Sequence, residues 1–330
     1  MKVAIAGAGM SGAYLYRLLD EEGIQADVYD VKRRNPCGLH SCAWGATPTS
    51  EVRKLVSRFL EPTAYELQRF DSINIEGLDI PADLLTIDKP RLINDLLCDT
   101  EVHTQPFDPN DYDRVVDATG EARAFLGPTS GPQFLAPCRQ YRIKLDEDLG
   151  MSIKISSLGY EWCFPIGNNE YHMGFGNLKT DTTEFRPSTT GVMERGKILC
   201  RCNSKVRLSS PHATQPFVSG NIVGVGESIG AVAPLAADGI VYAMQTAEML
   251  VDHWDNLEQY PTDILKRYDW MGKERQGLNR LFAGKMPSIR ELRAFLHHTR
   301  IAGLSLSLKQ AMFFFRRILD SQTEAEKSLG

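Results

Sequence analysis

The fold is decided by the first stretch of the chain, MKVAIAGAGMSG (residues 1–12). Within it, Lys2 to Ala6 is a short apolar run that ends in glycine, which is typical of a buried parallel strand. Ser11 to Glu22 follows, with apolar residues at helical spacing and a glycine placed to end the helix. Ala26 to Asp30 predicts a second strand. The first thirty residues therefore form a strand–helix–strand unit.

Three glycines lie at the turn between the first strand and the helix. Gly7 permits a tight turn, Gly9 lets the backbone approach phosphates, and Gly12 lets the helix and strand pack closely. The helix N-terminus adds unpaired N–H groups and the positive end of a dipole. Asp30 ends the second strand, 18 residues after Gly12, where a carboxylate can bind a ribose. A structural turn is the alternative, but the full context predicts an adenine dinucleotide site.

Helix and strand patterns alternate through the rest of the first 130 residues. Apolar spacing predicts a helix from Glu51 to Phe70. The further elements expected in this half are strands at 72–80, ending near 87 and at 114–118, and a helix at 90–97.

Helical periodicity disappears between residues 131 and 216. Alternating segments such as 140–145, 151–155 and 171–176 predict antiparallel strands instead. A buried-strand pattern returns at 221–226, followed by a helix at 239–252 and a helical region from 261 with breaks at 284–287 and Gly303. The expected division is a dinucleotide-binding domain from 1–130 and 216–260, a β-rich substrate domain from 131–215 to which 72–87 is a candidate addition, and a C-terminal helical region from 261–330.

Two later segments indicate which dinucleotide is bound. The strand at 114–118 runs into Thr119-Gly120, which resembles the second dinucleotide-facing turn of FAD enzymes. The segment 221–230 is a strand followed by Gly226-Glu227, which resembles a later FAD signature with glutamate in place of aspartate. A plain strand-to-helix turn is the alternative, but three segments in the expected chain order favour FAD over NAD.

The strongest resemblance lies in the β-rich block. Residues 160–165, Tyr-Glu-Trp-Cys-Phe-Pro, are followed after eight residues by Gly174-Phe175-Gly176. This resembles the signature of the geranylgeranyl reductase family, within the flavoproteins similar to para-hydroxybenzoate hydroxylase. A second match is Pro36-Cys37-Gly38, where that family carries a Cys-Gly loop near the flavin. The resemblance covers about residues 1–250 and implies an α/β fold: a Rossmann-like FAD-binding domain, an inserted antiparallel β-sheet substrate domain and a short C-terminal helical region.

The resemblance also implies the roles of individual residues. Glu227 would hold the ribityl chain, while Pro234 and the turn at 238–240 would face the isoalloxazine. The cofactor-binding candidates are Gly7, Gly9, Gly12, Asp30, Gly38, Thr119, Gly120, Gly226, Glu227, Gly230, Pro234, Gly239 and Ile240.

An apolar substrate is indicated by the aromatic segment itself. Tyr160, Trp162 and Phe164 alternate along one face of a strand, so their rings can line a slot for an isoprenoid chain, and Gly174 and Gly176 leave room beside it. An aromatic ladder in a sheet core is the alternative. The substrate-binding candidates are Trp44, Trp162, Phe164, Pro165, Gly174 and Gly176.

The expected reaction delivers a hydride from reduced FAD to one alkene carbon and a proton to the other. The candidate proton donors are Cys37, His40, Tyr160 and water. A zinc site on Cys37, His40 and Cys42 is disfavoured because no second cluster completes four ligands; Cys200 and Cys202 are separated by one residue only. We therefore expect no metal.

Three functions fit these motifs. The leading hypothesis is an FAD-dependent reductase that saturates C=C bonds of a polyprenyl chain on a lipid precursor; the second is a flavin monooxygenase of an apolar or aromatic compound; the third is a non-catalytic flavin- or lipid-binding protein. The segment Thr119 to Arg123 departs from the pattern tied to nicotinamide use in the hydroxylases. The electron donor therefore stays open between NAD(P)H and a protein such as ferredoxin.

Charge and composition bound the partners. The 330 residues carry a net charge of −5, which argues against a nucleic-acid binder. There is no stretch of about 18 apolar residues, the first strand begins without a signal-like leader, and the seven cysteines are scattered. We therefore expect reduced thiols and a cytoplasmic protein.

The C-terminal part is basic. Residues 285–317 hold seven Lys and Arg against one Glu, a local charge of +6, interleaved with apolar side chains that include Phe313 to Phe315. Such a segment can lie on anionic lipid, which would make the protein a peripheral membrane protein. A helix that packs its aromatic face on the protein and solvates its basic face is the equal alternative.

Overall fold

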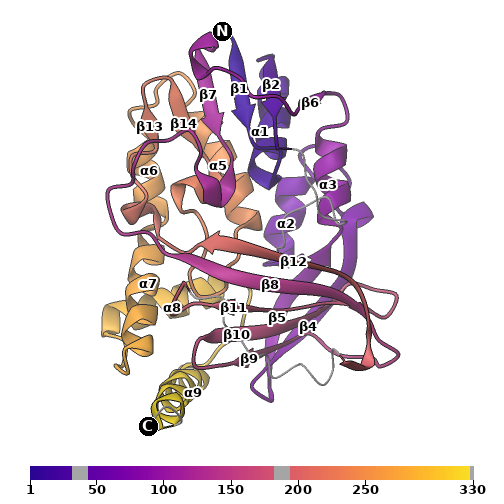
Figure 1. Ribbon diagram of the computed structural model, residues 1–330, viewed down its shortest axis with the longest axis vertical. Helices are drawn as coiled ribbons and strands as arrows, with labels where there is room; N and C mark the ends of the chain where they lie inside the picture. The colour runs from indigo at the N-terminus through magenta and orange to yellow at the C-terminus, as the bar shows by residue number, and fades with distance from the viewer. Residues whose placement is uncertain (32–43, 182–193, 328–330) are drawn as a thin grey trace.

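The computed structural model describes residues 1–31, 44–181 and 194–327, with side chains up to Gln322. Its elements form two sheets with helices packed around them, one sheet toward each end of the long axis, so that the N-terminus and the C-terminus lie at opposite ends (Figure 1). The α/β class predicted from the sequence is confirmed.

The first sheet has six strands in the order β13-β14-β7-β1-β2-β6. Strand β1 lies between β2 and β7 and is parallel to both, as a strand–helix–strand start requires. The strands are β1 (Val3–Ala6), β2 (Ala26–Tyr29), β6 (Val102–His103), β7 (Arg114–Asp117), β13 (Val218–Ser219) and β14 (Ile222–Gly224). All four residues of β1 are buried, because helices cover this sheet on its faces.

The helices of this region are α1 (Met10–Glu21), α2 (Thr49–Val56), α3 (Lys89–Leu96) and α5 (Ile240–Asp252). Helix α1 buries Leu15, Leu18 and Leu19 in the same core as α5, which is the apolar face that its sequence spacing predicts.

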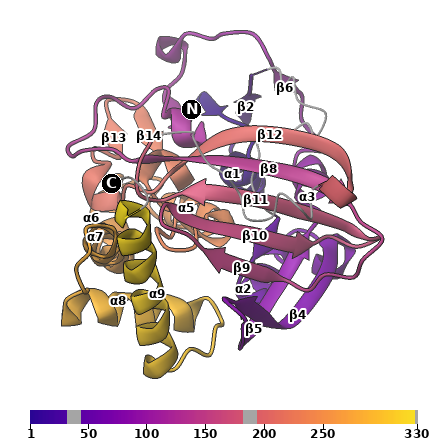
Figure 2. The same ribbon diagram turned by 60° about the horizontal axis from the view of Figure 1, so that its bottom comes forward.

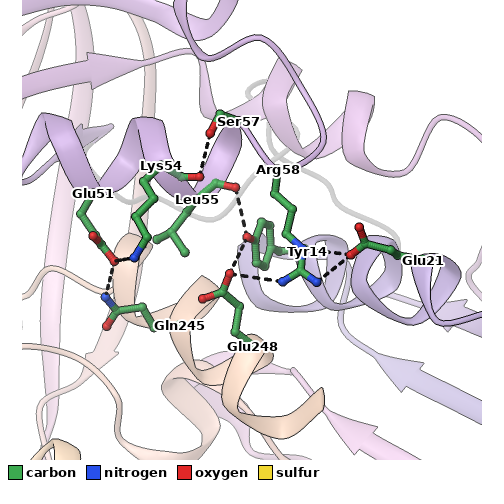
Figure 3. Close-up of polar contacts among 9 residues, drawn as sticks. All are labelled: Tyr14, Glu21, Glu51, Lys54, Leu55, Ser57, Arg58, Gln245 and Glu248. Atoms are coloured by element: carbon green, nitrogen blue, oxygen red, sulfur yellow. Dashed lines mark hydrogen bonds and ion pairs between the residues drawn. The ribbon is translucent and has the colours of Figure 1, made fainter. Parts of the chain in front are cut away.

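Polar contacts fix α2 against α1 and α5 (Figure 3). The Tyr14 hydroxyl donates to the Leu55 carbonyl at 3.0 Å and to Glu248 at 3.1 Å, so one side chain joins three helices. Arg58 extends the network to Glu21 at 2.6 Å and to Glu248 at 3.5 Å. The remaining contacts of the network run between Gln245 and Glu51, Glu51 and Lys54, and Ser57 and the Lys54 carbonyl.

The second sheet has eight strands in the order β12-β8-β11-β10-β9-β4-β5-β3. Neighbours are antiparallel except for β4 and β9. Its strands are β3 (Gly45–Ala46), β4 (Glu66–Ile75), β5 (Leu78–Ile87), β8 (Leu135–Lys144), β9 (Ser152–Ile155), β10 (Gly159–Pro165), β11 (Glu170–Asn177) and β12 (Lys197–Arg207). The sheet therefore takes its strands from two separate stretches of chain, 45–87 and 135–207.

Two predictions on the first stretch are wrong. The helix expected to run to Phe70 ends at Val56, because a 3-10 turn beginning at Pro62 redirects the chain and Glu66 opens β4. Phe59 and Leu60 still pack on the core from the turn after α2, which is why the apolar spacing continued past the helix end. The strand expected at 72–80 is a hairpin, whose two turn residues, Glu76 and Gly77, have φ of 53° and 81°.

The C-terminal region is helical with the two predicted breaks. It contains α6 (Tyr260–Arg267), α7 (Asp269–Phe282), α8 (Ile289–Ile301) and α9 (Leu308–Lys327). Helix α8 begins with a capping box between Ser288 and Glu291. Helices α8 and α9 lie beside one end of strands β9 to β11 (Figure 2). Within the described residues, no helix is long and apolar enough to cross a membrane.

Helix α9 packs through part of its aromatic run. Phe314 lies in a cluster with Ile73, Ile80 and Leu84 of the hairpin, and Phe315 lies in a cluster with helices α7 and α8. Phe313 points away and is 43% exposed. One face of α9 is therefore packed on the protein, and Phe313 lies on an exposed face.

Candidate flavin and substrate site

One large cavity connects the two sheets. Its volume is about 1450 Å³, and its wall includes Gly7 and Gly9 of the first sheet and Tyr160 and Phe164 of the second. A space of this size and mixed lining can hold a large cofactor together with an apolar ligand.

The glycine turn forms one end of the cavity. A Cβ atom on Gly7, whose φ is +110°, would lie 2.3 Å from the Ala118 carbonyl oxygen, and one on Gly12 would lie 1.9 Å from the Gly7 oxygen. A Cβ on Gly9 would meet no atom within 4 Å. Gly7 and Gly12 therefore allow the backbone to pack, and Gly9 leaves open space in front of the first turn of α1.

The acids predicted to bind the sugar parts also face the cavity. Asp30 lies directly after β2, and its carboxylate accepts from the Val31 N–H at 2.8 Å. Glu227 accepts from the Arg207 backbone N–H at 2.6 Å. Burial raises the pKa of Glu227 to about 7, against the lowering effect of that hydrogen bond. Its other carboxylate oxygen lies beside Gly120, where a Cβ would be 3.4 Å away.

Asp117 shapes the turn next to Glu227. Its carboxylate accepts from the Thr119 backbone and hydroxyl and from the Phe125 and Leu126 N–H groups, at 2.6–3.1 Å. Thr119 and Gly120 are thereby held on the cavity wall.

The loop before α5 forms the cavity wall between the two sheets. Residues 235–240 line it, and Gly239 and Ile240 are among them. Asp238 accepts from the Ile240 N–H at 3.1 Å, and burial raises the pKa of this acid to about 6. The Tyr160 hydroxyl donates to the Ala236 carbonyl at 2.6 Å, which ties strand β10 to this loop.

The aromatic residues Tyr160, Trp162 and Phe164 of β10 line the cavity. The ring centroids of Tyr160 and Trp162 are 6.0 Å apart, and those of Trp162 and Phe164 are 6.5 Å apart. Gly176 lines it too. Gly174 does not: a Cβ there would lie 2.3 Å from the Trp162 ring, so this glycine makes room for the indole.

Several other candidate residues lie outside the cavity lining. Trp44 packs edge-on against the His172 ring at 4.4 Å, and Pro165 lines a small polar pocket next to Gly167. The remaining ones are Gly12, Gly226, Gly230 and Pro234. Close backbone packing accounts for Gly226 and Gly230, which have φ of +64° and +75° and side-chain or backbone atoms within 3 Å of a Cβ position.

The far end of the cavity is apolar, and its residues were not predicted from the sequence. Helices α7 to α9 and the turn after α8 contribute Leu278, Phe282, Phe295, Leu304, Phe314 and Ile318. Most of them are the apolar positions of amphipathic helices. Such a pattern shows that a side chain is buried, but it does not show which part of the fold it packs against.

A buried pair on two of these helices was also missed. His298 of α8 lines the cavity, and its Nδ1 lies 2.7 Å from the Glu274 carboxylate of α7. The two residues are 24 positions apart, and no motif connects them in the sequence. Only the packing of α7 on α8 brings them together.

Cys37, Gly38, His40 and Cys42 lie outside the described residues. Elsewhere in the chain, residues 1–31, 44–181 and 194–327 contain no group of His, Cys, Asp and Glu side chains that could hold a metal ion. Cys98, Cys138, Cys163 and Cys202 form no disulfide, whereas Cys200 is disulfide-bonded. The expectation of reduced thiols is therefore wrong for Cys200.

The two sheets, the glycine turn and the cavity that both sheets line form a fold that this chain shares with FAD-dependent flavoproteins. Among solved structures, the chain resembles a geranylgeranyl bacteriochlorophyll reductase-like protein from Thermoplasma acidophilum, with a TM-score of 0.72 and 13% identity over 100% of this chain and 99% of that one. It also resembles a probable FAD-dependent monooxygenase, pqsL, from Pseudomonas aeruginosa, with a TM-score of 0.62 and 16% identity over 89% of this chain and 99% of that one. The similarity of this chain to both structures confirms the predicted fold.

The chain is also similar in sequence to other proteins. An uncharacterized protein from Methanocaldococcus jannaschii is 27% identical over 84% of this chain and 91% of its own length. A menaquinone reductase from Mycobacterium tuberculosis is 26% identical over 33% of this chain and 30% of its own length. No protein-family model matches the chain.

Proposed function

We propose that this protein is an FAD-dependent reductase that saturates C=C bonds of a polyprenyl chain, carried on a lipid precursor. The observation that carries the proposal is the single cavity that begins at the glycine turn and ends among apolar side chains of α7 to α9. An isoprenoid chain is apolar and long, and such a chamber buries it away from water. Two similar proteins are named as reductases, which agrees with the proposal.

The residues present fit FAD. The open space in front of Gly9 and the first N–H groups of α1 suit the pyrophosphate, Asp30 suits a ribose, and Glu227 suits the ribityl hydroxyls. When bound, FAD supplies hydride transfer. The protein binds and orients the substrate and excludes water.

The proton source is the open part of this reaction. Cys37, His40 and Tyr160 remain candidates, but Tyr160 is poorly suited. Its hydroxyl is committed to the Ala236 carbonyl, and burial raises its pKa far above the ordinary value, so it holds its proton tightly.

A flavin monooxygenase of an apolar or aromatic compound is the second candidate. Similar structures include the probable monooxygenase pqsL and the flavin-dependent halogenase CmlS. Thr119 lies just after strand β7, and it departs from the hydroxylase pattern that is tied to nicotinamide use. NAD(P)H and a ferredoxin-like protein are the two candidate electron donors.

Anaerobic reoxidation separates these candidates. The flavoprotein is reduced chemically, mixed with a geranylgeranyl compound, and followed by flavin absorbance and product mass. The reductase predicts reoxidation without oxygen and a gain of two hydrogens per bond reduced. Reoxidation only after oxygen is admitted, with an oxygenated product, would establish the monooxygenase instead.

We also propose that the protein is cytoplasmic and contacts anionic lipid through residues 285–317. Four large apolar side chains are exposed there, Met286, Ile289, Leu308 and Phe313, at 37–67%. They lie among seven Lys and Arg residues. Exposed apolar groups beside cations suit the surface of an anionic bilayer. Helices α8 and α9, which carry this segment, also line the apolar end of the cavity, so a lipid substrate would have a short path into it.

Vesicle sedimentation tests the contact. Wild-type protein should bind vesicles that contain anionic phospholipid and bind neutral vesicles weakly, and each Lys or Arg changed to Gln should weaken binding roughly fivefold. Ile289→Ser should also weaken binding, whereas Leu78→Ser, at an exposed leucine of β5, is the matched control. Equal binding of all variants to both kinds of vesicle would contradict the proposal.

A further inference from the structure

His298 and Glu274 form a buried pair that the proposed reaction has not yet used. Glu274 is fully buried and His298 is 2% exposed, yet both can carry a charge. Glu274 contacts His298 Nδ1 at 2.7 Å through one oxygen and accepts from the Leu235 N–H at 3.0 Å through the other. Burying ionisable groups costs free energy, and an unpaired charge would cost most. The pairing offsets that cost, and we therefore asked what the two buried groups could do.

The pair is tied to the part of the cavity that is expected to face the flavin. Leu235 begins the run of lining residues that continues to Ile240, and His298 lines the same cavity. The Glu274 carboxylate occupies Nδ1 of the imidazole. Nε2 is therefore the ring nitrogen available to a molecule in the cavity.

The surroundings favour an imidazolium. Burial lowers the pKa of His298, but the charge of Glu274, its hydrogen bond and the charge of Asp238 together raise it above the ordinary value. The indole of Trp270 is stacked on the imidazole at 4.8 Å and 29°, which fixes the plane of the ring and favours a cation. Two further titratable groups respond to the charges of this pair: His297 on α8 to His298, and Tyr242 on α5 to Glu274.

We propose that His298, held by Glu274, is the proton donor on the cavity wall. This inference rests on the proposed reductase reaction. The Nε2–H bond breaks and leaves its electron pair on the nitrogen, and the proton bonds to one alkene carbon through the π-electron pair. The other carbon receives the hydride that reduced flavin provides, so the alkene gains two hydrogens. The neutral imidazole then takes a proton from solvent. Glu274 is a positioning residue, since it acts through the imidazole.

The protonation of His298 can be measured without any substrate. NMR of ring-labelled histidines in the flavin-loaded protein follows each imidazole with pH, and His298→Gln assigns the signal. We expect His298 to titrate above the ordinary value of about 6.5 and to carry its proton at Nδ1 toward Glu274 throughout. Glu274→Gln should lower its pKa by roughly 1–3 units, because burial then acts with less opposition.

His297 provides the matched control on the same helix. Its pKa is lowered by its own burial and by the charge of His298, so His298→Gln should raise the pKa of His297. In turnover, His298→Gln should slow product formation and Glu274→Gln should shift the pH profile, while His297→Gln should do neither. A His298 pKa at or below about 6.5 in wild type, or no shift in Glu274→Gln, would overturn the inference. The proposed reductase reaction fails separately: it is contradicted if His298 titrates with the expected raised pKa but the protein reduces no alkene.

Discussion

Single glycines in the nucleotide turn have separable roles. Gly9 has an ordinary φ of −83° and open space at its Cβ position, whereas Gly12 contacts the Gly7 carbonyl. We expect Gly9→Val to fold normally but to weaken FAD binding at least tenfold, about 1.4 kcal/mol, because the side chain fills the space for the phosphates. Flavin fluorescence titration and thermal melting check this.

Gly12→Val is the matched control for that substitution. Its side chain would collide with the backbone of the turn, so the melting temperature itself should fall. A normal flavin affinity in Gly9→Val would contradict the assignment of this turn to the pyrophosphate.

The carboxyl group of Glu227 should make the flavin-free protein less stable as the pH rises. Burial raises its pKa to about 7 from 4.5, so the folded state binds a proton more tightly than the unfolded state. The stabilisation is therefore full below about pH 4.5 and is lost as the pH rises toward 7, and its size is on the order of 3 kcal/mol.

Urea unfolding at pH 5 and pH 8 measures this effect. Glu227→Gln cannot titrate, so its loss of stability between the two values should be smaller than in wild type. The pKa of Asp238 is also raised, so this residue keeps part of the pH dependence of stability in the variant. An identical loss in both proteins would show that Glu227 is not buried as described.

At the scale of elements, Tyr14 joins α1, α2 and α5 through one hydroxyl. Tyr14→Phe keeps the ring but removes both hydrogen bonds and leaves the buried Leu55 carbonyl without this donor. We expect a loss of about 1–2 kcal/mol in the free energy of unfolding. Tyr16→Phe, on the same helix, should change it little; equal losses in the two variants would contradict a specific role for the Tyr14 hydroxyl.

The sequence predicted elements where local pattern and tertiary packing agree. The strand–helix–strand start needed only apolar periodicity and three glycines, and β10 needed only alternation of aromatic residues. The failures at 51–80 have a different cause: turn residues after α2 bury apolar side chains as a helix would, and Glu76 takes a positive φ that is usual for Asn or Gly.

At the scale of the molecule, the cavity could not be predicted from the sequence of any one segment. Phe314 of α9 meets residues of the β4–β5 hairpin more than 200 positions earlier, and His298 meets Glu274 from another helix. Such contacts depend on how the helices pack on the sheet. Motifs pointed to the residues around the glycine turn, but the apolar end of the cavity could be found only in the fold.

The cavity also predicts that FAD should stabilise the molecule as a whole. Its wall includes both sheets and the loop at 235–240, so the bound cofactor would connect them. At a free FAD concentration of 100 times the dissociation constant, binding contributes about 2.7 kcal/mol to the free energy of unfolding. Thermal melting with and without FAD checks this, and an unchanged melting temperature would contradict a site that spans both sheets.

The most direct test of the central claim is anaerobic. Chemically reduced flavoprotein is mixed with a geranylgeranyl lipid, and flavin absorbance and product mass are recorded together. The proposed reductase predicts that the flavin reoxidises without oxygen while the product gains two hydrogens for each bond reduced. A flavin that stays reduced until oxygen is admitted, with the lipid unchanged, would contradict it.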